Sequence, residues 1–172
     1  MRKVEVVLHN PIWQEMFEDE SKYVANALGE NAIAIHHIGS TAISHIYAKP
    51  IIDLLVEVKD ILKVDKKSLS METLGYQVMG EFGISGRRFF LKNNQEGIRT
   101  HHIHIFEVGS AQIERHLAFR DYLIAHPEDA QRYSDLKCKL AIEHPTNIDG
   151  YMDGKNGFIE VIDKKAAQWR KR

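Results

Sequence analysis

The sequence contains a single cysteine, Cys138, among its 172 residues. One thiol excludes an intrachain disulfide and a zinc site built on several thiolates. No apolar run approaches the roughly 18 residues of a membrane-spanning helix. The N-terminus is basic, but Glu5, His9 and Asn10 interrupt any signal-peptide core. These absences lead us to expect a cytoplasmic protein with no membrane partner.

The sequence also lacks an excess of charge of either sign. Its 23 Lys and Arg residues nearly balance its 24 Asp and Glu residues, and the formal net charge is -1. The chain therefore lacks the overall positive charge that would favour a nucleic-acid partner. Hydrophobic residues make up 44% of the chain, which is ordinary for a globular protein and sufficient at this length for one domain with a real core.

Hydrophobic periodicity predicts strands and helices in a mixed order. Asn10 and Pro11 are typical of a helix start, as an N-cap residue and a proline at the first helical position, and Gly29 is typical of its end. Strands are expected at 4–8, 32–35, 51–58, 76–79, 87–92 and 99–107. Further helices are expected at 60–75 and after Ser110, the latter separated by His126-Pro127 and by Pro145 with Gly150.

This order of elements predicts an α+β fold close to the α/β class. We expect a mixed β-sheet flanked by helices in residues 1–108. Residues 109–172 are expected to form a helical C-terminal third that packs on the sheet, so that 1–172 is a single domain. No internal repeat or low-complexity segment argues for another organisation.

A glycine turn follows the strand expected at 32–35. Gly39 has no Cβ, so the backbone there can approach an oxyanion closely. The N–H groups of such a turn and the hydroxyls of Ser40 and Thr41 are suited to hold a phosphate group. We therefore expect Gly39, Ser40 and Thr41 to bind phosphate, and the alternative is a plain structural turn.

The strand expected at 51–58 carries two carboxylates among apolar residues, where a carboxylate is costly unless it is paired or binds a cation. Side chains alternate along a strand, so Asp53 and Glu57 share a face but lie about 13 Å apart, too far to hold one ion easily. Asp53 is the candidate site residue, and Glu57 is expected at a solvated strand end. The alternative for Asp53 is a structural pair with Lys49 or an arginine.

A second polar group lies in the strand that contains Thr100. His102 and His104 share one face of that strand about 7 Å apart, which lets both imidazoles reach one cation. If this strand lies beside that of Asp53, the three side chains meet. We then expect Asp53, His102 and His104 to be catalytic and to bind a divalent metal: Mg2+, Mn2+ or Zn2+. The alternatives are core histidines bonded to the backbone, and substrate binding without metal.

Further residues are placed to contact an anion. Of Arg87 and Arg88, which follow a glycine-rich loop, one is expected to meet solvent or a phosphate and the other to pair structurally. We assign Arg88 and Lys49 to the phosphate. Tyr151 and Lys155 lie four residues apart on one helix face. They are expected to bind substrate, with Tyr151 stacking on a base, and the alternative is an ordinary exposed face.

Taken together, these motifs resemble the GrpB family, also called UPF0157. The resemblance extends over nearly the whole chain and rests on residues 37–42, 48–53, 88–90, 101–104, 116–123 and 151–155 with Phe158. It implies the nucleotidyltransferase fold, in which a mixed sheet carries the site. The expected function is thus binding of a nucleotide or another phosphorylated small molecule, with nucleotidyl transfer as the reaction if the chain is an enzyme.

One residue departs from the wider nucleotidyltransferase pattern, which is Gly-Ser, a loop, and two carboxylates separated by one residue. Gly39-Ser40 and Asp53 match this pattern, but Leu55 stands where the second carboxylate belongs. Two-magnesium nucleotidyl transfer needs carboxylates to hold both ions. Leu55 therefore favours an alternative, a non-catalytic ligand-binding or accessory domain. The histidine strand favours another alternative, a metal-dependent phosphoester hydrolase.

Overall fold

The computed structural model describes residues 3–171, which divide into two compact units. The helical unit consists of residues up to 11, residues 39–50 and residues from 114 onward. The sheet unit consists of residues 12–38 and 51–113. The helical part expected from the sequence therefore also includes an N-terminal arm and the segment that contains the Gly39 turn.

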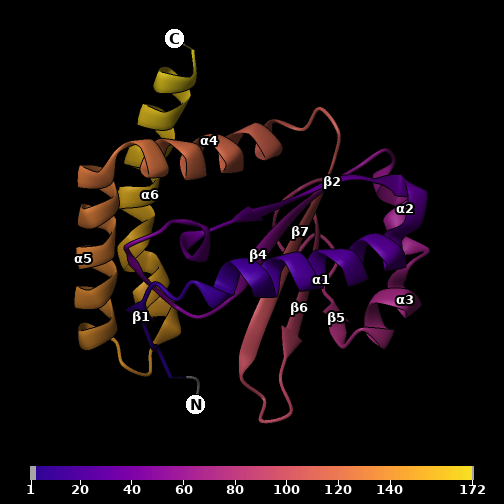
Figure 1. Cartoon of the computed structure of the whole chain (residues 1–172), viewed down its shortest axis with the longest axis horizontal. Coiled ribbons are helices and arrows are strands. Elements are labelled where there is room, and N and C mark those ends of the chain that lie inside the picture. The colour runs from indigo at the N-terminus through magenta and orange to yellow at the C-terminus, as the bar shows by residue number, and fades with distance from the viewer. Residues whose placement is uncertain (1–2, 172) are drawn as a thin grey trace. The chain divides into compact units, whose positions relative to one another are not determined.

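A mixed β-sheet forms the centre of the sheet unit (Figure 1). Its strands lie in the order β2-β4-β7-β6-β5. Their bounds are β2 (Ala32–Ile38), β4 (Ile52–Val58), β5 (Tyr76–Val78), β6 (Arg88–Asn93) and β7 (Arg99–Glu107). The central pair β4 and β7 is parallel, whereas the other neighbours are antiparallel. The predicted α+β fold with a mixed sheet is confirmed.

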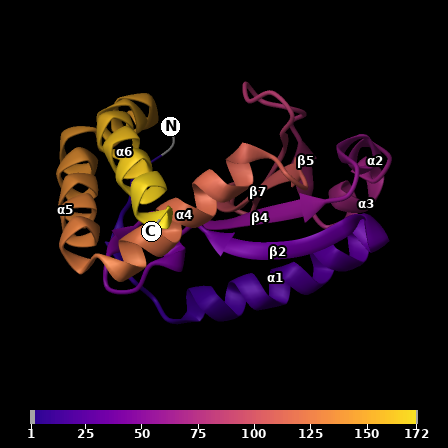
Figure 2. The same cartoon turned by 90° about the horizontal axis from the view of Figure 1, so that it is seen from above.

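Helix α1 (Ile12–Leu28) covers one face of this sheet and contacts β2 and β4 (Figure 2). Its apolar face buries Trp13, Val24 and Leu28, as the helical spacing of these residues predicts. The 3-10 turn η1 (Gly29–Asn31) then leads into β2. Side chains alternate along β7, so His102 and His104 lie on the opposite face of the sheet from α1.

The single helix predicted at 60–75 is wrong, because two shorter helices occupy this stretch. They are α2 (Ile61–Asp65) and α3 (Ser68–Thr73). Asp60 caps α2 by accepting a hydrogen bond from the Leu62 N–H at 2.9 Å. The Lys67 N–H then donates to the Val64 carbonyl at 2.9 Å, three residues back, and this tightened turn ends α2 before α3 begins.

The helical unit is built on helices α4 to α6 and a two-stranded sheet. Its elements are β1 (Val7–Leu8), the 3-10 turn η2 (Ser40–Ala42), β3 (Tyr47–Ala48), α4 (Ala111–Ala125), α5 (Pro127–Glu143) and α6 (Ile148–Arg170). Helix α4 begins in the sheet unit and continues into this one. Strands β1 and β3 pair antiparallel, and α5 packs against α6 (Figure 1). The core contains Ile43, Ile46, Tyr122, Leu123, Tyr133 and Ile162.

Pro145 and Gly150 were expected to separate the last helix from the one before it, and the structure corrects this for Gly150, which lies inside α6. Asn147 is the cap, since its side chain accepts from the Gly150 N–H at 3.0 Å. Both Gly150 and Gly154 lie against neighbouring side chains: a Cβ on Gly154 would lie 2.4 Å from Leu140 Cδ2. These glycines therefore permit close packing in the helical unit. Of the helices in residues 3–171, none has the length and apolarity to cross a bilayer.

Candidate functional site

Asp53, His102 and His104 meet on the parallel strands β4 and β7. Asp53 lies opposite His102 in the register, and Leu55 lies opposite His104. Asp53 Oδ1 is 3.4 Å from His102 Nδ1 and 3.1 Å from His104 Nε2. The three side chains are mostly buried, with exposed fractions of 22%, 20% and 14%. The predicted meeting of these residues is confirmed, while Glu57 pairs separately with His36 at 2.6 Å.

Two arginines determine which imidazole nitrogens carry protons. Arg99 Nη1 lies 2.8 Å from His102 Nε2, and Arg87 Nη1 lies 3.3 Å from His104 Nδ1. A guanidinium group can only donate, so each of these ring nitrogens must accept. The opposite nitrogens therefore bear the hydrogens. His102 Nδ1–H and His104 Nε2–H both donate to Asp53.

This arrangement favours the ionised form of Asp53 and the neutral form of His102. Burial acts to raise the pKa of Asp53, but the hydrogen bonds from His102 and His104 outweigh it and hold that pKa well below its ordinary value. Burial lowers the pKa of His102, and the bond to Asp53 offsets this only in part. Asp53 is thus a poor general base but a strong hydrogen-bond acceptor. Both imidazoles lie within 3.4 Å of the same carboxylate oxygen, Oδ1 of Asp53.

The predicted divalent metal does not fit this donor set. A metal needs the lone pair of a ring nitrogen, and the nitrogens facing Asp53 carry hydrogens. Within residues 3–171, no group of three or more His, Cys, Asp or Glu side chains is arranged to hold a metal ion. Metal binding at Asp53, His102 and His104 stays a prediction. It would require each imidazole to move its proton to the ring nitrogen that now accepts a hydrogen bond from an arginine.

Aromatic rings support the site. The Phe89 ring centre lies 5.3 Å from that of His102 and 5.2 Å from that of His104. Phe82 stacks on Phe89 with centres 5.2 Å apart, yet 56% of Phe82 is exposed. Phe82 also has a positive φ of 48°, which is uncommon for a bulky residue. The exposed ring of Phe82 is therefore separated from the two imidazoles only by the ring of Phe89.

The structure exchanges the roles of the two neighbouring arginines. Side chains alternate along a strand, so Arg87 lies on the face of Phe89 and His104 whereas Arg88 lies on the other. Arg88 Nε and Nη2 bind the carboxylate of Asp65 at 2.7 and 3.2 Å. Arg88, predicted to contact phosphate, thus pairs with a carboxylate, and its contact with phosphate stays a prediction. Arg87, buried beside His104, takes its place in the candidate site.

In the helical unit, the turn at Gly39 has the tight geometry that the sequence indicated. Gly39 has a φ of 75°, a value that side chains disfavour. The Ala42 N–H donates to the Gly39 carbonyl and the Ile43 N–H to the Ser40 carbonyl, both at 3.1 Å. Thr41 is buried. Phosphate binding by Gly39, Ser40 and Thr41 stays a prediction.

The helical unit also brings together the predicted residues Lys49, Tyr151 and Lys155. The Nζ atoms of Lys49 and Lys155 lie 5.1 and 5.0 Å from the Tyr151 ring centre. Tyr151 is fully buried and Lys155 is 8% exposed, so the alternative of an ordinary exposed face is wrong. Sequence reasoning missed Lys137, which is 1% exposed on α5. Its helical spacing from the inward-facing Tyr133 was the available signal.

Comparison with known proteins assigns the family. The family model described as "GrpB protein" matches residues 3–165. The chain belongs to the GrpB family.

Relatives of this GrpB-family chain differ in length. It is 47% identical to the UPF0157 protein YqkA of Bacillus subtilis, a match that covers 99% of this chain but 49% of YqkA. It is 34% identical to the glutamate-rich protein GrpB of Alkalihalophilus pseudofirmus, covering 94% of this chain and 96% of that protein. The crystal structure of the conserved protein GrpB from Enterococcus faecalis matches with a TM-score of 0.94 and 45% identity, covering 98% of this chain and 100% of that one.

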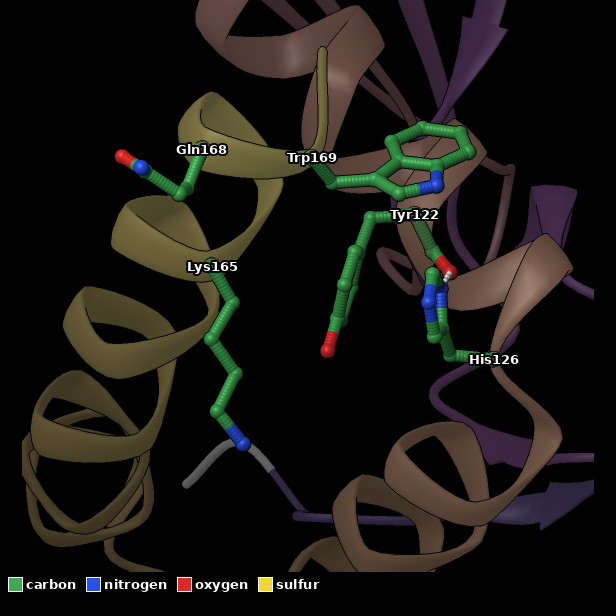
Figure 3. Close-up of a pocket in the computed structure, with 5 residues that line it drawn as sticks. All are labelled: Tyr122, His126, Lys165, Gln168 and Trp169. Carbon is green, nitrogen blue, oxygen red and sulfur yellow. Dashed lines mark hydrogen bonds between the residues drawn. The ribbon is translucent and has the colours of Figure 1, made fainter. Parts of the chain in front are cut away.

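The helical unit of this GrpB-family chain has a further hollow, of about 220 Å³, which Figure 3 shows. It is lined by Tyr122, His126, Lys165, Gln168 and Trp169. The rings of Tyr122 and His126 stack with centres 3.9 Å apart, and His126 Nδ1 donates to the Tyr122 carbonyl at 2.8 Å. The Tyr122 hydroxyl donates to Asp129 at 2.6 Å. Because Tyr122 and His126 already form hydrogen bonds within the protein, we centre the candidate site on Asp53.

Proposed function

We propose that this GrpB-family chain binds a nucleotide or another phosphorylated small molecule. The observation that carries the proposal is the cluster of Asp53, His102 and His104 with its two arginines. Arg87 and Arg99 contact the imidazole nitrogens that face away from Asp53, and burial favours the neutral form of His102. Guanidinium groups in such a partly buried cluster are suited to bind a phosphate group.

The same cluster offers contacts for the rest of a nucleotide. In this proposal the carboxylate of Asp53, which is 22% exposed, accepts a hydrogen bond from a sugar hydroxyl, and the 56% exposed ring of Phe82 stacks on a base. The sequence motifs also indicate phosphate contacts at Gly39, Ser40 and Thr41 and at Lys49, Arg88 and Lys155, and these belong to the proposal, as does stacking of Tyr151 on a base.

Burial of Leu55 favours a second candidate function, ligand binding without turnover. Leu55 is fully buried in β4, so the position of the second carboxylate is part of the core. Nucleotidyl transfer through two metals lacks a required ligand there. Phosphoester hydrolysis with a metal on His102 and His104 is opposed by the hydrogens that both rings direct at Asp53. Binding of the ligand is therefore the function that the geometry supports best.

Calorimetry with nucleoside triphosphates, in the presence and absence of Mg2+, Mn2+ or Zn2+, tests the proposal. We expect the wild type to bind and Asp53→Asn to bind at least about ten-fold more weakly, since a charged acceptor is lost. Glu57→Gln is the matched control on the same strand, and it should bind like the wild type. Absence of binding by the wild type, or equal binding by Asp53→Asn, would contradict the proposal.

Incubation with radiolabelled ATP and a cell extract separates binding from turnover. The binding reading predicts no labelled product. A product that forms with the wild type and is lost in His102→Gln would instead establish nucleotidyl transfer.

A further inference from the structure

A buried amine on α5 lacks the partners that its chemistry requires. Lys137 is 1% exposed, and its Nζ has no hydrogen-bond partner among the residues that the structure describes. An ammonium group has three N–H donors. The nearest aromatic partner, the Tyr133 ring with its centre 4.4 Å from Nζ, can satisfy them only weakly. The position thus lacks a hydrogen-bond acceptor.

Two further buried groups come from α6, which packs against α5. The hydroxyl of the fully buried Tyr151 also has no hydrogen-bond partner in the described part of the chain. Lys155 is 8% exposed, and its Nζ lies over the Tyr151 ring. Unpaired buried polar groups are costly. Lys137 and Tyr151 are donors from two packed helices that have no acceptor in the described part of the chain, and they indicate a site for an acceptor that comes from outside it.

We propose that Lys137, Lys155 and Tyr151 form a binding site for an oxyanion, the phosphate group of the ligand. Phosphate oxygens are strong acceptors for two ammonium groups and a hydroxyl. Lys49, which lies over the same Tyr151 ring, marks the way in, because its Nζ is 3.9 Å from Sδ of Met152, which is 40% exposed. This inference rests on the proposed function for the class of ligand, and it adds the subsite and Lys137.

The charges around the amine support an anion. Burial lowers the pKa of Lys137 to about 6, and repulsion from Lys155 and Lys49 contributes, while Cys138 acts in the opposite direction. These are the groups that act on the amine from α5, α6 and the segment after β3, and no carboxylate is among them. A bound phosphate would reverse this balance and favour the protonated amine. Binding near neutral pH should therefore take up a proton.

Calorimetry with inorganic pyrophosphate tests the site. We expect the wild type to bind with uptake of about one proton per anion, measured in buffers of different ionisation enthalpy. Lys137→Met should weaken binding by about ten-fold or more and abolish the proton uptake. Lys155→Met provides a second variant with the same loss of affinity. Lys139→Met is the matched control, since Lys139 is an exposed residue of α5 that pairs with Glu143, and it should bind like the wild type.

The outcomes separate the subsite from the proposed function. Failure of the wild type to bind pyrophosphate, or equal binding by Lys137→Met, Lys155→Met and Lys139→Met, would overturn the subsite. Nucleotide binding that depends on Asp53 but not on Lys137 would also overturn it and leave the proposed function standing. Pyrophosphate binding that depends on Lys137, with no binding of nucleotides, would support the oxyanion site and remove the nucleotide proposal.

Discussion

His104 donates a hydrogen bond of 3.1 Å to Asp53, although the two residues lie 51 positions apart in the sequence. The parallel pairing of β4 and β7 brings them together, and Arg87 behind His104 determines the direction of the bond. The strands thus place the groups, and the arginines assign their protons. The first prediction tests this assignment.

We expect His104 to carry its proton on Nε2 and His102 on Nδ1. Long-range nitrogen–proton NMR of the imidazole rings distinguishes the two tautomers directly. Replacement of Arg87 by Met should release the His104 tautomer and leave that of His102 unchanged, because Arg99 holds the latter. Addition of Zn2+ should leave the ring resonances in place, since the donor set does not fit a metal. The opposite tautomers, or Zn2+-dependent shifts of both rings, would refute the assignment.

Replacement of Arg87 by Lys should loosen the glycine-rich loop before β6. Arg87 Nε donates to the Glu81 carbonyl at 3.2 Å and Nη2 to the Phe82 carbonyl at 2.8 Å. A lysine has a single amine and cannot reproduce this pair of hydrogen bonds from one guanidinium group. The Ile84 and Gly86 amides should therefore exchange hydrogen about ten-fold faster. Arg88→Lys, next in sequence but paired with Asp65, is the control. Equal exchange rates in Arg87→Lys and the wild type would show that these two hydrogen bonds do not hold the loop.

Two glycines of α6 should respond to alanine in opposite directions. A Cβ on Gly154 would collide with Leu140, so Gly154→Ala should lower the free energy of unfolding by about 1–3 kcal/mol. Gly157 has open space around it, so Gly157→Ala should raise that free energy by about 0.5–1 kcal/mol. Urea denaturation measures both. An unchanged or raised free energy of unfolding in Gly154→Ala would show that packing against α5 does not require Gly154.

Replacement of Lys137 by Met should stabilise the protein when no anion is present. Removal of an unpartnered buried amine should raise the free energy of unfolding near neutral pH by about 1–3 kcal/mol. Between about pH 6 and the ordinary lysine value of 10.5, the amine is charged in the unfolded chain and neutral in the folded one. Folding then releases a proton, so rising pH favours the folded wild type.

The advantage of Lys137→Met should consequently shrink as the pH rises towards 10.5. Denaturation of both proteins over a pH series measures this difference, with Lys139→Met as the control that shows no such trend. An advantage that grows with pH would mean that the folded protein holds the charged amine.

The centre of the sheet site could be predicted because it depends on few quantities. Alternation along two strands and the assumption that those strands are neighbours were sufficient to bring Asp53, His102 and His104 together. The choice between Arg87 and Arg88 was harder, because an error of one residue moves a side chain to the other face. The predicted strand started at Arg87 and the observed strand starts at Arg88, so the pattern alone could not assign the pair.

The spacing of Lys137 from Tyr133 was a weak signal of burial. A lysine next to apolar helix positions is usually a surface residue whose stem covers its neighbours. Its burial depends on α6, where Gly154 allows contact with Leu140 one turn further along α5. Similarly, the assignment of residues 39–50 to the helical unit depends on contacts with residues far along the chain, such as the bond from the Tyr47 N–H to Ser134 Oγ at 2.8 Å.

The three-segment construction of the helical unit has a consequence for biosynthesis. Ile43 and Ile46 leave the ribosome long before α5 and α6, against which their cluster is completed. The nascent chain must therefore carry these apolar side chains without their native cover until α5 and α6 have been translated. We expect the emerging polypeptide to recruit chaperones at this segment, and slow translation of the stretch that encodes α5 and α6 to prolong that exposure.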